Sequence, residues 1–310
     1  MEVPFTKYNL LTILGPTASG KTSLAANIAY QLKGEVISAD SRQVYKRMDI
    51  GTGKDFHDYL ISGKNIPYHL IDIAEPGEKY NVFQYQKDFL TVYQSFKERS
   101  VFPVLCGGSG MYIEAVLSGY QLLEVPPDSA LRYELEQMTV DDLIEKLKEK
   151  KALHNTTDIT HKKRLIRAIE IATYQEKNPV DKSRPLPRLN SLIVGTYIDR
   201  ESRRKKITAR LNHRLSNGMI EEVKRLLGEG IPPGDLIFYG LEYKFITLYL
   251  TGEMDYDTMK EKLNIAIHQF AKRQMTWFRK MERSGFKIYW LDTTLSMEDK
   301  VKEVMVLLGN

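Results

Sequence analysis

The chain has 310 residues, which is enough for one large domain or two modest ones. Its 42% hydrophobic and 27% charged residues fit a globular protein with a sizeable core and exclude a largely disordered chain. The lone cysteine, Cys106, excludes an intrachain disulfide, and the net charge of +5 says little by itself.

The N-terminal sequence MEVPFTKYNL has no basic region followed by an apolar run, so we expect no signal peptide. No apolar stretch approaches the roughly 20 residues that span a bilayer, which predicts that the protein has no membrane partner. Together with the single cysteine, these features predict a cytoplasmic protein. No long apolar heptad pattern indicates a coiled-coil dimer, and we therefore expect a monomer.

The first predicted strand, Tyr8–Leu14, ends at the glycine that opens GPTASGKT, and a helix is predicted over Lys21–Leu32. The pattern G-x-x-x-x-G-K-[ST] between a strand and a helix is typical of a P-loop. Backbone N–H groups and the positive end of the helix bind phosphate there, the lysine adds charge, and the Thr22 hydroxyl is a ligand for Mg²⁺. Such a loop is suited to a nucleotide such as ATP or to a diphosphate. The predicted binding residues are Gly15, Pro16, Thr17, Ala18, Ser19, Gly20, Lys21 and Thr22.

Short apolar runs predict further strands, several of them separated by helical patterns. They cover Glu35–Ser38, Tyr68–Ile73, Pro103–Cys106, Leu192–Ile198 and Phe286–Leu291. Strands that alternate with helices indicate a parallel sheet that is covered on both faces. The predicted fold class is therefore α/β, a P-loop NTPase-like parallel sheet with helices on both faces and an all-helical insertion domain.

The insertion is predicted where the alternation stops, because charged helical patterns replace the strands. The predicted helices are Ser129–Met138, Val140–Leu153 and Lys162–Gln175, and a Pro- and Arg-rich loop follows at Asn178–Arg188. We predict three segments: the first part of the P-loop core over 1–125, the helical insertion over 126–188, and the second part of the core with C-terminal helices over 189–310.

Two acidic residues and a glycine-rich turn follow predicted strands. Asp40 lies just after the strand 35–38, at the sheet edge where ligands bind in such folds. A carboxylate there could bind Mg²⁺, act as a base, or cap a turn. Asp72 resembles the acid at the end of a Walker B strand. The turn in CGGSGMYIEAVL, Cys106–Leu117, either lets the backbone approach a ligand or is simply tight.

Basic residues gather in three tracts, each of which could be no more than a solvated helix face. They are HKKRLIR (161–167), DRESRRKKITARLNHR (199–214) and AKRQMTWFRKMER (271–283). Three such tracts in a chain with a phosphate site favour an RNA backbone as partner, and aromatic residues could stack on splayed bases. Helical spacing places Arg273, Trp277 and Lys280 on one face, although burial is the commoner role of a tryptophan.

In chain order, GPTASGKT, SADSRQVYKRMDIGTGK, GGSGMY, RLIRAIE and AKRQMTWFRK resemble the motifs of bacterial tRNA dimethylallyltransferases. The resemblance runs over most of the chain, whereas P-loop kinases share only the first motif. It implies transfer of a dimethylallyl group from dimethylallyl diphosphate to the N6 amine of the adenine just 3′ of the anticodon, in tRNAs that read codons beginning with U. It also implies Mg²⁺ as cofactor and a helical insertion that binds tRNA.

The resemblance implies roles for individual residues. Asp40 would be the general base, Arg210 would stabilise the departing diphosphate, and Ser109, where the family usually has Thr, would line the channel between donor and amine. The chain departs from the family at Tyr239–Phe245, YGLEYKF, where a glycine, a tyrosine, a basic and an acidic or amide residue are common. The residues expected to contact tRNA are Asp40, Ser41, Arg42, Gln43, Ser109, Lys163, Arg164, Arg167, Lys272, Arg273, Gln274, Trp277, Arg279 and Lys280.

Two other functions are compatible with parts of the sequence. A P-loop kinase that acts on a nucleotide or a small metabolite would use ATP and would not need three basic tracts. A non-catalytic, nucleotide-regulated RNA-binding protein would leave Asp40 with a structural role. Thermal stabilisation by dimethylallyl diphosphate, by ATP or by RNA alone would separate the three functions.

Overall fold

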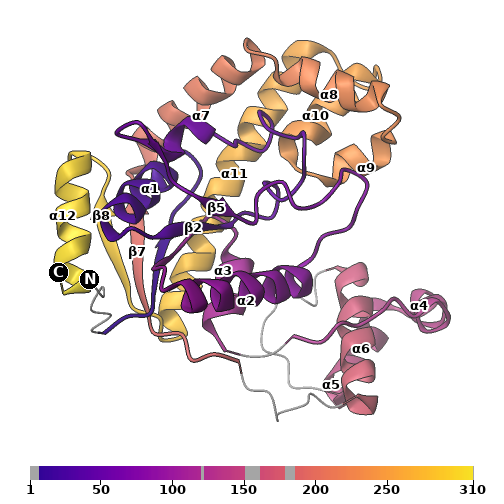
Figure 1. Cartoon of the computed structure of the whole chain (residues 1–310). Helices are drawn as coiled ribbons and strands as arrows, with labels where there is room; N and C mark the ends of the chain where they lie inside the picture. The colour runs from indigo at the N-terminus through magenta and orange to yellow at the C-terminus, as the bar shows by residue number, and fades with distance from the viewer. Residues whose placement is uncertain (1–6, 120–121, 151–160, 179–185, 310) are drawn as a thin grey trace. The chain divides into compact units, whose positions relative to one another are not determined.

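The structure is a computed structural model that describes residues 7–119, 122–150, 161–178 and 186–309. Contacts divide the chain into two compact units, the core unit (1–119 with 188–310) and the insertion unit (120–187). The core unit contains a six-stranded sheet in the order β5-β2-β6-β1-β7-β8, and all its neighbouring strands are parallel (Figure 1). The strands are β1 (Leu10–Leu14), β2 (Glu35–Ala39), β5 (Tyr68–His69), β6 (Pro103–Gly107), β7 (Ser191–Tyr197) and β8 (Ile288–Asp292).

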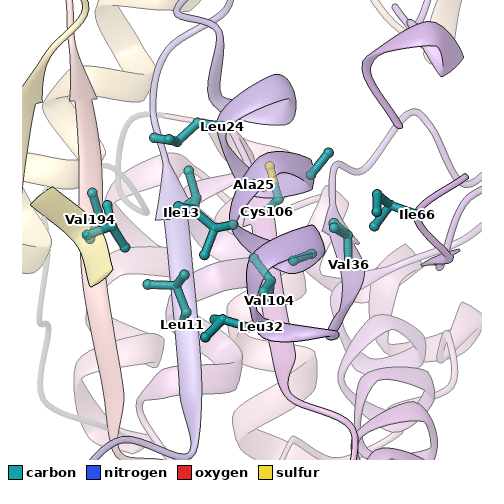
Figure 2. Packing of buried hydrophobic residues seen from close by; sticks show 14 of the residues in the cluster. Leu11, Ile13, Leu24, Ala25, Leu32, Val36, Ile66, Val104, Cys106 and Val194 are labelled. Carbon is teal, nitrogen blue, oxygen red and sulfur yellow. The ribbon is translucent and has the colours of Figure 1, made fainter. Parts of the chain in front are cut away.

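Both faces of the sheet are buried. Successive side chains of a strand point to opposite faces, and all five residues of β1 are buried. In β1, Leu11 and Ile13 pack with α1 (Lys21–Leu32) and α12 (Met297–Leu308), as Figure 2 shows for α1. Leu10 and Leu14 pack on the other face, with residues of α2 (Val82–Arg99), α3 (Gly110–Leu117) and α11 (Tyr256–Arg283). The predicted class, a P-loop-like parallel sheet with helices on both faces, is confirmed.

A helical block with its own hydrophobic core follows β7. It consists of α7 (Arg200–Leu215), α8 (Met219–Gly228), α9 (Pro233–Phe238), α10 (Leu241–Leu250) and part of α11. Three side chains from the segment after β2, Val44, Tyr45 and Met48, are buried in the same core. This segment is therefore anchored to helices that lie more than 150 residues further along the chain.

The segment after β2 leads through a 3-10 turn, η1 (Phe56–Tyr59), into a short antiparallel ribbon of β3 (Leu60–Ile61) and β4 (Lys64–Asn65). The predicted strand 68–73 is shorter than expected and ends at His69. Leu70 and Asp72 have positive φ, and the N–H groups of Asp72 and Ile73 donate to carbonyls of the segment after β2. The chain thus leaves the sheet to pack on that segment.

The insertion unit contains α4 (Ser129–Glu136), α5 (Val140–Lys150) and α6 (Lys162–Lys177), around a small core that includes Leu135, Leu143 and Ile169. The three predicted helices are present, although residues 151–153 of the second lie outside the described residues, as does most of the predicted loop 178–188. In the part of the chain that the structure describes, no helix is long and apolar enough to cross a bilayer.

Candidate active site

The loop Gly15–Gly20 joins the end of β1 to the start of α1, and its path depends on glycine at two positions. A Cβ at Gly15 would lie 2.0 Å from Oγ1 of Thr196 on β7, so a larger residue does not fit. Gly20 has a φ of 76°, in the left-handed region, directly before α1 begins. Ser19 Oγ lies 2.6 Å from Thr196 Oγ1, which ties the loop to β7. The loop is therefore held in place by the sheet beneath it.

Two cations face the space above this loop. Lys21 is the first residue of α1, and burial lowers the pKa of its ammonium, while Cys106 and Asp40 act in the opposite direction. Arg210 reaches in from α7 and donates to Thr17 Oγ1. Burial lowers the pKa of Arg210 to about 10, so the guanidinium keeps its charge at neutral pH. A desolvated pair of cations favours an anionic ligand.

Asp40 stands at the carboxyl end of β2, where the strand turns into the segment 41–55, here called the motif loop. Its Oδ1 accepts from the Arg42 N–H at 2.9 Å, and its side chain lines the cavity above Lys21. Ser109, directly before α3, accepts from the Ser41 N–H at 3.0 Å. The predicted base and the predicted channel residue therefore meet at one sheet edge, although Asp40 also caps its own turn.

A carboxylate from α8 holds the far end of the motif loop. Glu222 is buried and accepts N–H bonds from Asp49 and Ile50 at 2.8 Å and from Gly51 at 3.0 Å. Tyr243 on α10 donates its hydroxyl to the same carboxylate at 2.6 Å. Glu222 thus satisfies three successive backbone donors of a segment that belongs to no helix or strand.

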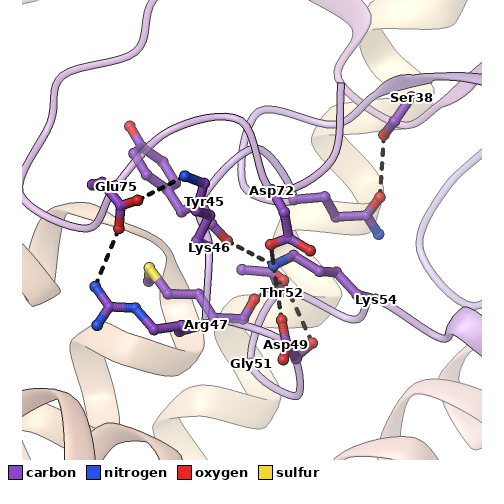
Figure 3. A network of polar contacts seen from close by, with 12 residues as sticks. Ser38, Tyr45, Lys46, Arg47, Asp49, Gly51, Thr52, Lys54, Asp72 and Glu75 are labelled. Carbon is purple, nitrogen blue, oxygen red and sulfur yellow. Dashed lines mark hydrogen bonds and ion pairs between the residues drawn. The ribbon is translucent and has the colours of Figure 1, made fainter. Parts of the chain in front are cut away.

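Lys54 fixes the same loop from inside (Figure 3). Its buried ammonium donates to the Tyr45 carbonyl at 2.6 Å, to Asp49 at 2.8 Å and to Asp72. Asp72 follows the edge strand β5 and lines neither cavity of the site. The interpretation of Asp72 as a Walker B acid is therefore wrong, since this carboxylate pairs with Lys54 instead. An apolar run before an Asp does not tell where the strand lies in the sheet.

Two cavities meet at the P-loop. The first, the P-loop cavity, measures about 330 Å³. It is lined by Thr17–Thr22, Asp40, Gln43, Thr52, Gly53, Asp55, Asp58, Tyr59, Cys106, Gly107, Lys206 and Arg210. The second, the α10 cavity, measures about 420 Å³ and shares Thr17, Lys21, Asp40, Thr52 and Arg210 with the first. Its remaining lining includes Ser41, Arg42, Ser109, Arg214, Phe238, Glu242, Phe270, Arg273 and Gln274. Asp40 and Arg210 lie at the junction of the two spaces.

The oxygen atoms that line the P-loop cavity supply only part of a Mg²⁺ site. Thr22, Asp40, Asp55 and Asp58 line it, and hydroxyl and carboxylate oxygens are the ligands that Mg²⁺ prefers. Asp55 pairs with Arg214 at 3.1 Å, and burial and Asp55 raise the pKa of Asp58. Among the described residues, no cluster of three or more His, Cys, Asp or Glu side chains is placed to hold a metal. An ion there would need oxygens from a bound phosphate and from water, as is usual for Mg²⁺.

The predicted tRNA-contact residues of α11 are divided between the interior and the surface. Gln274 is buried, accepts from the Thr17 N–H at 2.9 Å and donates to the Gly108 carbonyl at 3.0 Å. It joins the P-loop to the turn after β6 and also lines the α10 cavity, and its contact with tRNA stays a prediction. The side chains of Lys272, Arg273 and Arg279 are exposed on the same helix.

Trp277 also has a packing role. Its indole lies against α3, where a Cβ at Gly110 would come within 2.4 Å of the ring, so glycine is required there. The Lys280 ammonium lies 4.9 Å from the ring centroid and pairs with Glu114 at 2.7 Å. Trp277 is partly buried, as the alternative to base stacking predicts, and Lys280 is already paired.

The remaining predicted tRNA contacts lie in the motif loop and in the insertion unit. Gln43 donates to the Gly53 carbonyl at 3.0 Å and accepts from Ser38, so it braces the motif loop. On α6, Lys163 and Arg164 are exposed. Arg167 instead donates to the buried Glu170 and to a backbone carbonyl, so part of its role is structural.

Sequence reasoning missed several residues of the site, four of which hold its loops or line its cavities with charged groups. These four are Lys54, Arg214, Glu222 and Glu242. The lysine closes the quoted motif SADSRQVYKRMDIGTGK, and its position there was a usable signal. The acidic residues lie in ordinary amphipathic helices, where a buried Glu looks like an exposed one.

A family model described as IPP transferase matches residues 43–281, and one described as isopentenyl transferase matches residues 8–71. A tRNA dimethylallyltransferase 2 of Bacteroides fragilis is 59% identical over 297 residues, which cover 96% of this chain and 97% of that protein. A tRNA dimethylallyltransferase 1 of Parabacteroides distasonis is 57% identical, over 98% of both chains.

Among solved structures, a tRNA isopentenylpyrophosphate transferase from Bacillus halodurans matches with a TM-score of 0.71 and 31% identity. The match covers 98% of this chain and 96% of that one. The similarity therefore extends over both the core unit and the insertion unit.

Proposed function

The chain belongs to the tRNA dimethylallyltransferase family and transfers a dimethylallyl group to tRNA, and we propose that dimethylallyl diphosphate is the donor and an adenine N6 amine the acceptor. The proposed adenine is the one just 3′ of the anticodon in tRNAs that read codons beginning with U. The observation that carries this proposal is the position of Asp40 and Arg210 at the junction of the two cavities. The proton acceptor must reach the amine, and the cation must reach the departing diphosphate. Both groups are therefore needed where the allylic C–O bond breaks and the C–N bond forms.

The P-loop cavity is proposed to hold the diphosphate. Backbone N–H groups at the start of α1, with Lys21, bind its oxygens, and Arg210 faces it from α7. As the allylic C–O bond breaks, negative charge grows on the diphosphate, and these fixed donors stabilise that charge. Thr22 would hold Mg²⁺, which would supply further charge stabilisation for the leaving group.

Asp40 is proposed to be the general base. An exocyclic adenine amine is a poor nucleophile, because its lone pair is delocalised into the ring. The amine must lose a proton as nitrogen bonds to the allylic carbon, and the Asp40 carboxylate accepts it. The Arg42 N–H and the Ser109–Ser41 contact hold the turn that carries this carboxylate. Its second oxygen remains for the substrate, because only Oδ1 has a bond to Arg42.

The adenine is proposed to enter the α10 cavity after it leaves its stack, as enzymes that modify bases require. Phe238 and Phe270 line that cavity, and both side chains are substantially exposed. The tRNA backbone is proposed to lie on exposed cations such as Lys163 and Arg164 of the insertion unit and Lys272 and Arg279 of α11.

A single-turnover assay tests the proposal. The protein is mixed with radiolabelled dimethylallyl diphosphate, Mg²⁺ and unmodified tRNA whose anticodon ends in A. We expect label in the tRNA, and none when the adenine beside the anticodon is replaced by guanine. Label that survives this replacement would contradict the proposed acceptor. Absence of label, with ATP consumed when small nucleotides are supplied, would contradict the proposed donor.

A further inference from the structure

A second carboxyl group lies in the α10 cavity, and the mechanism above does not use it. Glu242 is the second residue of α10, and its side chain lines the α10 cavity but not the P-loop cavity. Its position depends on the residue before the helix, because Gly240 has a φ of 144° that few other residues adopt. The chain thus enters α10 through an extended conformation that favours glycine, and residues of the first turn of α10 line the cavity.

Glu242 is partly buried, and the positive charges around it offset its own charge only in part. Arg214 and Arg210 on α7 act electrostatically on it, yet no ion pair within 4 Å joins it to either of these described residues. Arg214 pairs with Asp55, and Arg210 donates to Thr17. Burial raises the pKa of the Glu242 carboxyl, against the effect of its own backbone N–H and of the two guanidinium groups. Burial therefore disfavours the charged form of this carboxyl.

The α10 cavity around this carboxyl is suited to a planar base. Arg42 lies with its guanidinium carbon 5.5 Å from the centroid of the Phe238 ring, and 60% of Phe238 is exposed. Phe270, which also lines the cavity, is 40% exposed and has the Arg273 guanidinium 5.9 Å from its centroid. Flat apolar surfaces backed by guanidinium groups bind bases by stacking. Stacking alone does not tell one purine from another.

We propose that Glu242 is a specificity-determining residue for the acceptor base, and that its carboxyl group hydrogen-bonds the edge of the adenine that carries the N6 amine. This inference rests on the proposed function. A protonated carboxyl has a donor and an acceptor side by side, and adenine presents an N–H of N6 beside an unprotonated ring nitrogen, N1 or N7. At the N7 side guanine presents two acceptors, O6 and N7, so a carboxyl group with a single donor cannot make both bonds there. At the N1 side, discrimination against guanine requires that the proton be held on the oxygen that faces N1.

The first test uses the unaltered protein and altered tRNA. The adenine beside the anticodon is replaced by 1-deazaadenine or by 7-deazaadenine, each of which lacks one ring acceptor. We expect one of the two to lower the single-turnover rate or the tRNA affinity by about 10- to 100-fold. If both analogues react like adenine while the natural tRNA is labelled, the inference is wrong and the proposed function stands. If natural tRNA is not labelled, the proposed function itself has failed.

The second test compares Glu242→Gln with Glu242→Leu. Glutamine keeps a donor beside an acceptor, as in its known pairing with adenine, so E242Q is expected to stay close to wild type. E242L should lose about 10- to 100-fold and become insensitive to the deaza substitution. The matched control is Glu221→Gln, an exposed Glu in the first turn of α8. If E242Q and E242L are equally impaired and bind dimethylallyl diphosphate less tightly, Glu242 acts on the arginines and the inference is overturned.

Discussion

The P-loop and the motif loop contribute to the same site, but they are held in different ways. The P-loop joins a strand to the helix that follows it, and its fixed points are close by: β7 beneath it and the first turn of α1 above it. The motif loop is held by side chains from distant elements, chiefly Glu222 on α8 and Tyr243 on α10. One loop takes its shape from the sheet, and the other from the helical block that follows β7.

The two loops also have different tasks in the proposed reaction. A diphosphate is recognised by backbone N–H groups, which a contiguous strand, turn and helix place, with side chains of β7, α7 and α11 bonded to the turn. A general base must be placed relative to a base from another molecule, so its loop has to be rigid while it faces a large partner. Buried polar groups such as Glu222 and Lys54 supply that rigidity where no sheet hydrogen bonds exist.

The largest expected effect comes from the start of the motif loop. Asp40→Asn keeps the shape and the acceptor for the Arg42 N–H but removes the base. Turnover should fall by about 10²- to 10⁴-fold, with tRNA binding retained. Rates are measured in single-turnover assays and affinity by filter binding. Asp257→Asn, an exposed acid in the first turn of α11, is the control. Unchanged turnover in D40N would remove Asp40 from the mechanism.

The corresponding change beside the P-loop should cost somewhat less. Arg210→Leu removes a cation that lines both cavities, and loss of one such donor to a developing charge costs about 10²- to 10³-fold in turnover. Arg210→Lys keeps a charge but loses the planar group that bonds Thr17, and should be intermediate. Single-turnover rates and calorimetric affinity for dimethylallyl diphosphate separate the two effects. Turnover in R210L equal to wild type would show that the P-loop and Lys21 suffice.

Glu222→Gln tests the architecture of the motif loop. The amide cannot accept all of the bonds from Asp49, Ile50, Gly51 and Tyr243, and its NH₂ group faces donors. We expect the free energy of unfolding to fall by about 1.5–3 kcal/mol, since these bonds go to a charged group. Turnover should also fall, because the loop that carries Asp40 loosens. Denaturant unfolding measures the first effect, and Glu221→Gln, exposed on the same helix, controls for the lost charge.

The two loops also differ in how well the sequence predicts them. GPTASGKT between an apolar run and a helical pattern predicts the P-loop, because its strand, its glycines and the start of its helix are contiguous in the sequence. Its contacts with Thr196, Arg210 and Gln274 are long-range and could not be predicted in this way.

The carboxyl end of the strand before Asp40 likewise predicts the edge at which this residue lies, whereas the role of Ser109 was implied only by the resemblance to the family. Glu222 and Glu242 could not be found, since burial of a helical glutamate is decided by partners far away in the chain. The Asp72 hypothesis was wrong because the strand before this residue lies at the edge of the sheet, and strand order is also decided by distant parts of the chain.

The smallest effect is expected where the P-loop meets the sheet. Ser19→Ala removes the bond to Thr196, and Thr196→Val removes the same bond from β7 together with the 3.3 Å contact between Thr196 and the Leu14 carbonyl. Each variant should lose about 0.5–1.5 kcal/mol of unfolding free energy, and the double variant should lose less than the sum, since the Ser19–Thr196 bond is common to both. Affinity for dimethylallyl diphosphate should change little, because the loop keeps its glycines and the start of α1. A loss as large as in E222Q would mean that the Ser19–Thr196 contact is as important to the P-loop as Glu222 is to the motif loop.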